Sequence, residues 1–188
     1  MNKLKIIIAL MSAALLSACA TEKQVHRTEQ EVTAAAALNK EAAKVADADY
    51  FTEVEFAPGS TTLTPSSQRS INNLLNRAKG RGELKEVVVL AWADQELPSK
   101  EKKNLTGPQR KLADNRNKSV EKYIDSLSTG VDVDTYNMAE RPAALGRMLN
   151  TRDARFKETL TAAGLPTTAS DPQYPSKASR AVILVNIK

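Results

Sequence analysis

Four segments after residue 50 have the apolar spacing of β-strands. Bulky apolar residues recur through 50–56, and 86–93 contains an unbroken apolar run over 87–92. Because that run offers apolar residues to both faces of a sheet, it predicts a central, covered strand. The segments 131–138 and 180–187 predict two further strands.

Two helices are predicted between these strands. Thr64 and Pro65 form a strong helix start, with threonine as the N-cap and proline in the first turn, and Gly80 is a suitable stop. A longer helix is predicted over 107–127. The apolar stripe of the first helix consists of Ile71, Leu74, Leu75 and Ala78. That of the second consists of Leu112, Val120, Tyr123, Ile124 and Leu127.

The segment 142–164 is also helical in its pattern and predicts two pieces that meet near Asn150 and Thr151. Strands that alternate with helices indicate an α/β sandwich with some parallel strand pairing. No internal repeat or break is visible in 50–188. This range is therefore predicted to be one domain.

The N-terminus has the layout of a secretory signal peptide. Lys3 and Lys5 precede an apolar run over 6–16 that is too short to span a bilayer comfortably. Residues 16–19, Leu-Ser-Ala-Cys, resemble the lipobox of bacterial lipoproteins. The resemblance implies a signal peptide over 1–18 and diacylglycerol on Cys19, with ordinary secretion and a chance cysteine as the alternative. Cys19 is the only cysteine, so no internal disulfide competes for it.

The segment 19–49 is predicted to be a partly helical tether. From residue 20 onward it is polar and rich in alanine, has no glycine or proline, and is too poor in apolar residues to form a core. As a helix it would reach about 45 Å, and fully extended roughly 100 Å. By resemblance to enteric lipoproteins, Ala20 after the cysteine implies sorting to the outer membrane, with the domain in the periplasm.

Composition and net charge say little about the function of the protein. Hydrophobic residues make up 41% of the 188 residues but aromatic residues only 4%, so the predicted core is aliphatic. The net charge of +5 falls to +3 (5 − 2 = 3) once Lys3 and Lys5 are removed with the signal peptide. Such a weakly basic chain permits an acidic partner without identifying one.

No cofactor, metal or catalytic activity is expected. The sequence has no phosphate-binding glycine loop and no metal-ligand cluster, and its only histidine, His26, lies in the tether. Asp132 and Asp134 alternate with apolar residues on a strand, which surface solvation explains better than acid–base catalysis. The basic run over 100–103 has no aromatic platform and belongs to an exported chain, so nucleic-acid binding is not expected.

One charged residue lies on the apolar stripe of the long helix. Arg116 is costly there unless it is paired or reaches solvent. Side chains lean toward the N-terminus of their helix, and in a strand–loop–helix unit this end lies near the end of the preceding strand, where Asp94 stands. The pattern predicts an Asp94–Arg116 pair at the mouth of the fold. Alternatively, Arg116 extends along the core edge into water and Asp94 is only a turn residue.

Several short pieces of 50–188 form a recognisable combination: Val54-Glu55-Phe56, Gly59-Ser60, Leu63, 87–94, 112–116, Val120, Tyr123-Ile124, and Ser179-Arg180 before 182–185. Together they resemble the OmpA-like domain, the peptidoglycan-associated module of Gram-negative envelopes. The resemblance implies a two-layer sandwich, with helices packed on a mixed sheet of about four strands. A helical insertion over about 143–165 is then extra to the family pattern.

The resemblance also implies noncovalent binding of the peptide stem of peptidoglycan. The positions that match the family's diaminopimelate-binding residues are Asp94 and Arg116, and Gln109 aligns with a family asparagine. Arginine suits the diaminopimelate carboxylate and aspartate suits its ammonium group. The sequence departs from the family at Ala91-Trp92-Ala93, where Gly-x-Thr is usual, and in a longer loop over 95–106.

Two functions follow as hypotheses. The first is an outer-membrane lipoprotein that binds peptidoglycan and so links the envelope to the cell wall. The second is a protein-interaction module of an envelope complex, in which the Asp94–Arg116 pair is only structural and the segments 95–106 and 143–165 carry the binding surface. The first hypothesis requires both Asp94 and Arg116 for binding, whereas the second tolerates their loss.

Overall fold

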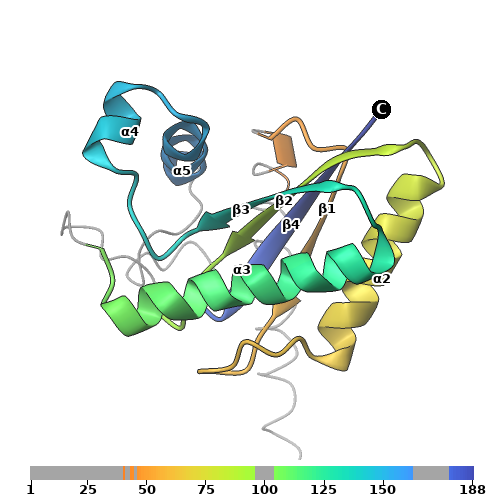
Figure 1. Ribbon diagram of the computed structural model, residues 1–188, viewed down its shortest axis with the longest axis horizontal. Coiled ribbons are helices and arrows are strands. Elements are labelled where there is room, and N and C mark those ends of the chain that lie inside the picture. The colour runs from red at the N-terminus through yellow and green to blue at the C-terminus, as the bar shows by residue number, and fades with distance from the viewer. Residues whose placement is uncertain (1–39, 41–42, 45, 96–103, 163–177) are drawn as a thin grey trace, which may run out of the picture.

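The computed structural model describes residues 40, 43–44, 46–95, 104–162 and 178–188. Strands and helices alternate along it (Figure 1). In chain order they are β1 (Tyr50–Glu55), α2 (Pro65–Lys79), β2 (Leu84–Ala91), α3 (Gly107–Leu127), β3 (Asp132–Asn137), α4 (Ala144–Met148), α5 (Arg152–Ala162) and β4 (Arg180–Ile187). No helix in these described ranges is long and apolar enough to cross a membrane.

The four strands form one mixed sheet in the order β1-β4-β2-β3. β2 and β3 run parallel and are joined through α3, whereas β4 runs antiparallel to both of its neighbours, β1 and β2. The predicted α/β fold with a mixed four-stranded sheet is therefore confirmed. The apolar run of β2 lies inside the sheet, between β4 and β3, as its two apolar faces require.

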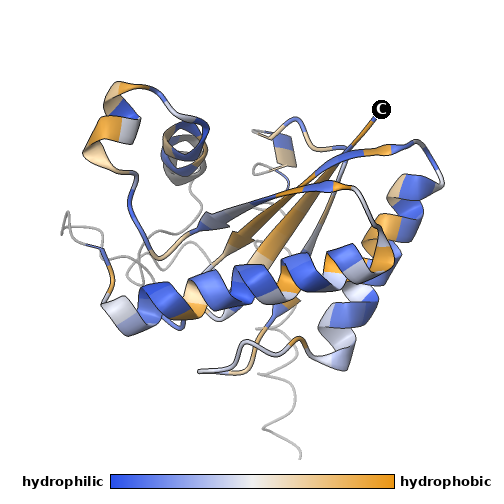
Figure 2. Ribbon diagram, in the orientation of Figure 1, coloured by the Kyte–Doolittle hydropathy of each residue, from blue (hydrophilic) through white to orange (hydrophobic). Residues whose placement is uncertain are grey.

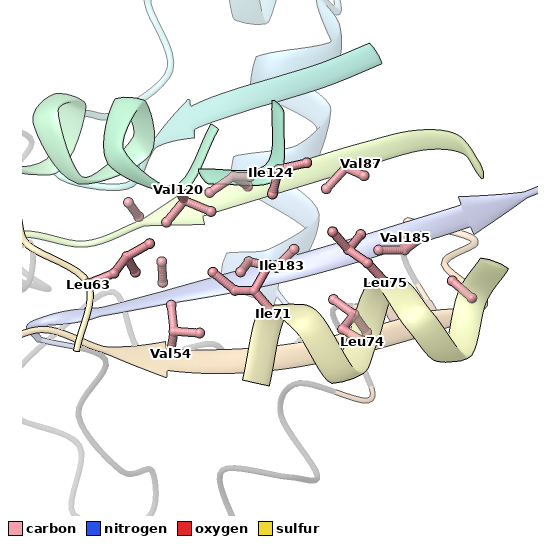
Figure 3. Close-up of a cluster of buried hydrophobic side chains, with 14 of the residues drawn as sticks. Val54, Leu63, Ile71, Leu74, Leu75, Val87, Val120, Ile124, Ile183 and Val185 are labelled. Atoms are coloured by element: carbon pink, nitrogen blue, oxygen red, sulfur yellow. The ribbon is translucent and has the colours of Figure 1, made fainter. Parts of the chain in front are cut away.

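One face of the sheet is covered by α2 and α3 (Figures 1 and 3). Alternate residues of the strands point to this face and meet the predicted helix stripes in an aliphatic core. The core includes Val54, Ile71, Leu74, Leu75, Val87, Val89, Val120, Ile124, Ile183 and Val185, all at most 2% exposed. This packing fixes the position of α3 on the sheet. It therefore also fixes the position of Arg116 near the end of β2.

The predicted helix ends are confirmed where the structure describes them. Thr64 caps α2 by accepting a hydrogen bond from the Ser67 N–H, and Gly80 ends the helix. The break between α4 and α5 falls at Asn150 and Thr151, with Asn150 in the left-handed region at φ 50°. Asparagine is among the few residues that adopt this region readily, which explains why the helical pattern divides here.

The opposite face of the sheet is covered by α5 and by the segment around Ala43. Phe156 of α5 stacks on Tyr136 of β3 with ring centroids 5.1 Å apart, in a second cluster that includes Leu90, Trp92 and Leu184. The helical insertion thus adds a partial third layer to the predicted two-layer sandwich.

An ion-pair network fastens α5 to the sheet. Arg152 Nη1 lies 2.5 Å from a carboxylate oxygen of Glu86 and 2.5 Å from one of Asp134. The hydrogen bond from Arg152 is the main reason that the pKa of Glu86 lies below its usual value, while burial raises the pKa of Asp134. Asp134 is therefore more than a solvated surface residue, because it helps to hold the insertion in place.

Several predictions concern residues outside the described ranges. Cys19, the signal peptide, most of the tether, the basic run over 100–103 and the end of the 143–165 insertion all lie there. The domain limits proposed from the sequence stay predictions.

Candidate functional site

Two segments that are distant in sequence from α3 meet around the guanidinium group of Arg116. Its Nε donates to the Ser60 carbonyl at 2.9 Å, and its Nη1 donates to the Trp92 carbonyl at 2.9 Å. Its Nη2 donates to the Ala57 carbonyl at 3.3 Å and to Asp94 Oδ1 at 2.5 Å. The side chain is 0% exposed. Arg116 therefore ties the segment after β1 to the end of β2.

Arg116 can be buried because its surroundings compensate its charge. Uncompensated burial of a cation is very unfavourable, whereas here carbonyl dipoles and one carboxylate surround the guanidinium. The Phe56 ring adds a cation–π contact, with its centroid 5.0 Å from the guanidinium carbon. The predicted Asp94–Arg116 pair is confirmed as a contact, and the alternative in which Arg116 reaches water is wrong.

Asp94 is held from three further directions. Its Oδ1 also accepts from the Ser179 hydroxyl at 2.7 Å, and its Oδ2 accepts from the Gly59 N–H at 2.6 Å. Its own N–H donates to Gln109 Oε1 at 3.0 Å. The three candidate residues Asp94, Arg116 and Gln109 are thus brought together in one site, with Gln109 acting on the backbone that carries the carboxylate.

The carboxylate of Asp94 remains partly open to solvent, with a side chain 22% exposed. Partial burial by itself raises its pKa, but the hydrogen bonds from Ser179, Arg116 and the Gly59 N–H outweigh burial and hold the pKa below its usual value. Oδ2 accepts one hydrogen bond from the described residues, and a carboxylate oxygen can accept two. The site therefore presents a fixed, ionised oxygen that can receive a cationic donor.

Gly59 and Ser179 belong to the site although the sequence did not single them out as binding residues. Gly59 has φ +70°, a left-handed conformation that glycine adopts freely and that turns its N–H toward Asp94. Ser179 has φ 60°, which is unusual for serine, and its hydroxyl and N–H reach Asp94 and the Ala93 carbonyl. Both residues lie in segments of the sequence that resemble the OmpA-like domain. That resemblance was the signal that could have identified them.

The described residues contain no group of three or more His, Cys, Asp or Glu side chains that could hold a metal ion. The polar groups around Asp94 are two side-chain donors, a backbone amide and the amide of Gln109. These groups orient the Asp94 carboxylate and hold it ionised, which suits the binding of a cationic group.

The stability that Asp94 contributes should depend on pH in a defined direction. Because the pKa of Asp94 is depressed in the folded state, its contribution is fully present above the unfolded pKa of about 3.9 and is lost as the pH falls through the lower folded pKa. We expect the difference in unfolding free energy between the parent and Asp94→Asn to be constant from about pH 8 to pH 5 and to shrink below about pH 4. Urea unfolding followed by circular dichroism at each pH measures this difference.

The control for this measurement is Asp125→Asn, which removes one exposed carboxylate near the far end of α3. Its difference from the parent should stay small at every pH. A difference for Asp94→Asn that did not shrink in acid would show that the ionised carboxylate adds nothing to folding.

The chain is similar in fold to two solved structures. The OmpA-like domain of FopA1 from Francisella tularensis subsp. tularensis SCHU S4 is 12% identical, with a TM-score of 0.38, over 73% of this chain and 75% of that one. A MotB-like protein from Desulfovibrio vulgaris is 13% identical, with a TM-score of 0.39, over 88% of this chain and 99% of that one. No protein-family model matches the sequence, and no curated protein matches it.

Proposed function

We propose that this protein is an outer-membrane lipoprotein, anchored through lipid on Cys19, whose periplasmic domain binds peptidoglycan noncovalently. The observation that carries the proposal is Asp94, an oriented and ionised carboxylate that stays partly open at the end of β2. The ligand is the diaminopimelate residue of the stem peptide, which offers an ammonium group to this carboxylate. The resemblance of the surrounding sequence to OmpA-like domains supports the choice of ligand.

Each candidate residue has a distinct role in this proposal. Asp94 accepts hydrogen bonds from the ligand ammonium, and Gln109 fixes the backbone of Asp94. Arg116 is the partner for the ligand carboxylate, but the carbonyls of Ala57 and Ser60 occupy its Nη2 and Nε. A carboxylate therefore reaches Arg116 only when the 57–60 segment gives way. Binding is then expected to be coupled to a local movement of that segment.

Co-sedimentation with purified diaminopimelate-type peptidoglycan tests the proposal. The protein used is the chain from Ala20 onward, which lacks both the signal peptide and the lipid site. We expect the parent and Asp125→Asn to pellet with the wall, and Asp94→Asn to lose at least about tenfold in affinity, as expected when a charge-assisted contact is removed. Circular dichroism must first show that each variant is folded, since Asp94 also stabilises Arg116.

A folded parent that stays in solution overturns wall binding. Equal pelleting of the parent and Asp94→Asn would place the wall-binding site elsewhere on the domain. Peptidoglycan that carries lysine in place of diaminopimelate provides a ligand control, because it lacks the second carboxylate. Weaker binding to that wall is expected if Arg116 takes part.

The complete burial of Arg116 favours a second function. With a 0% exposed side chain and four hydrogen bonds, Arg116 has the environment of a structural residue. The domain would then be a protein-interaction module of an envelope complex, with its partner bound elsewhere. In that case affinity-purified partners from the envelope would be the same for the parent and for folded Asp94→Asn.

A further inference from the structure

The short helix α4 presents an apolar face to solvent. Leu145, Met148 and Leu149 are 65%, 82% and 64% exposed and are the exposed large hydrophobic residues among those that the structure describes. Leu145 and Met148 lie in α4 and Leu149 directly follows it, and their spacing of three and four positions puts them on one side. Figure 2 shows α4 coloured largely as hydrophobic, in contrast to the outer side of α3. An apolar cluster of this kind on a surface marks an interaction site.

The charged residues within the stretch that contains α4 are all arginines. Between Glu140 and Asp153 the sequence contains three arginines, Arg141, Arg147 and Arg152, and no acidic residue. Arg152 is engaged with Glu86 and Asp134. Arg147, within α4 itself, is exposed and forms no ion pair with any residue in the described ranges. Apolar side chains beside an available arginine suit a surface that is both apolar and anionic.

Through its neighbour α5, this face is connected to Ala43, a described residue on the N-terminal side of β1. α4 contacts α5, and Phe156 of α5 lies in the cluster that contains Ala43. About two dozen residues connect Cys19 to Ala43, which span at most about 85 Å. A lipid on Cys19 would therefore keep α4 within reach of the membrane surface.

We propose that α4 rests on the anionic surface of the membrane that holds the lipid of Cys19. Leu145, Met148 and Leu149 enter the boundary between headgroups and acyl chains, and Arg147 contacts lipid phosphates. This inference rests on the lipid anchor of the proposed function, but it does not depend on peptidoglycan binding.

Membrane contact through α4 leaves the Asp94 site free. In Figure 1, α4 lies at the upper left, whereas the segment between β1 and α2, which supplies Ala57, Gly59 and Ser60 to that site, lies at the bottom. The surface proposed to contact the membrane and the candidate site are therefore separate parts of the domain.

The test uses the full lipidated chain, reconstituted in vesicles of phosphatidylcholine alone or with phosphatidylglycerol. Cys19 is the only cysteine and carries lipid on its sulfur in the proposed form, so Met148→Cys introduces the only free thiol. An environment-sensitive fluorophore on that thiol reports whether α4 enters the bilayer. The matched control is the same fluorophore on Lys122→Cys, an exposed position on α3 at the other face of the sheet.

We expect a blue-shifted emission from the residue 148 probe on vesicles with phosphatidylglycerol, and quenching by lipids that carry a nitroxide. Both signals should fall at least severalfold on neutral vesicles or when Arg147→Glu is added, and the residue 122 probe should show neither. A residue 148 probe that behaves like the residue 122 probe overturns the inference. So does a shift that depends on protein concentration and not on lipid charge, because that result indicates a second copy of the chain on this face.

Thiol titration of the unmodified parent separates this failure from failure of the anchor. A parent with no free thiol has its lipid, so a negative result for residue 148 then counts against the α4 surface alone. A parent with one free thiol lacks the lipid on Cys19. That result removes the anchor from the proposed function, and the α4 inference falls with it.

Discussion

Replacing Asp94 with alanine should lower the free energy of unfolding by about 3–5 kcal/mol, because it leaves the buried charge of Arg116 without its carboxylate partner. Arg116 is 0% exposed, and within the described residues Asp94 is its ion-pair partner, at 2.5 Å. The carbonyls of Ala57, Ser60 and Trp92 remain as acceptors, but they supply dipoles and no countercharge. This loss is a large part of the stability of a typical domain.

A double-mutant cycle shows whether the loss comes from the pair. Arg116→Met removes the charge and keeps an apolar side chain of similar length, but it takes the Arg116 donor away from the buried Trp92 carbonyl and the partly buried Ser60 carbonyl, so it should also destabilise the domain. The combination with Asp94→Ala should cost clearly less than the two single changes together, since neither charge is then left alone. Chemical unfolding followed by circular dichroism gives all four values.

Arg110→Ala is the matched control on the same helix. Arg110 forms an ion pair with Glu140 in which both side chains are more than one third exposed. An exposed pair of this kind contributes at most about 1 kcal/mol. If Asp94→Ala cost no more than Arg110→Ala, the Asp94–Arg116 pair would not be the tie between β2, α3 and the 57–60 segment that its geometry indicates.

Replacing Trp92 with alanine is expected to cost about 3–5 kcal/mol, the range for removing a large buried aromatic side chain. Trp92 is 2% exposed and packs in the cluster between the sheet and α5, together with Leu90, Tyr136 and Phe156. Its carbonyl accepts from Arg116 on the other side of the same strand end. The change should therefore loosen both the α5 layer and the candidate site.

Circular dichroism is the suitable probe for this variant, because Trp92 is the only tryptophan and its fluorescence is lost. Trp92→Phe is the control and should cost less, since it retains most of the apolar volume. A loss below about 1 kcal/mol for Trp92→Ala would mean that α5 closes over the cavity without penalty. That outcome would show that α5 packs on the sheet much less rigidly than the burial of Trp92 suggests.

The elements of this fold were readable from the sequence because local signals mark them. The start of α2 is marked by Thr64 and Pro65 and its end by Gly80, through capping preferences that act within one turn. The apolar run of β2 and the helical spacing on α3 identify their buried faces without reference to other segments. The pairing of Asp94 with Arg116 was also predictable, because a strand–loop–helix unit has a limited set of geometries.

The remainder of the site required contacts between segments that are far apart in the chain. Ser179 reaches Asp94 across 85 positions of sequence, and the Gly59 N–H does so across 35. No local pattern encodes such a contact, because it depends on how β4 pairs with β1 on one side and with β2 on the other. The role of Asp134 in holding Arg152 was missed for the same reason.

By itself, the sequence determined the alternation of strands and helices and the buried faces of these elements, because each depends on spacing within one or two neighbouring elements. It also indicated the charged pair at the end of β2, but left open the alternative in which Arg116 reaches water. Only the tertiary structure decided that Arg116 is fully enclosed, that α5 covers the second face of the sheet and that α4 is left exposed. These features depend on long-range packing, in which a side chain is buried or exposed according to what the whole chain places over it.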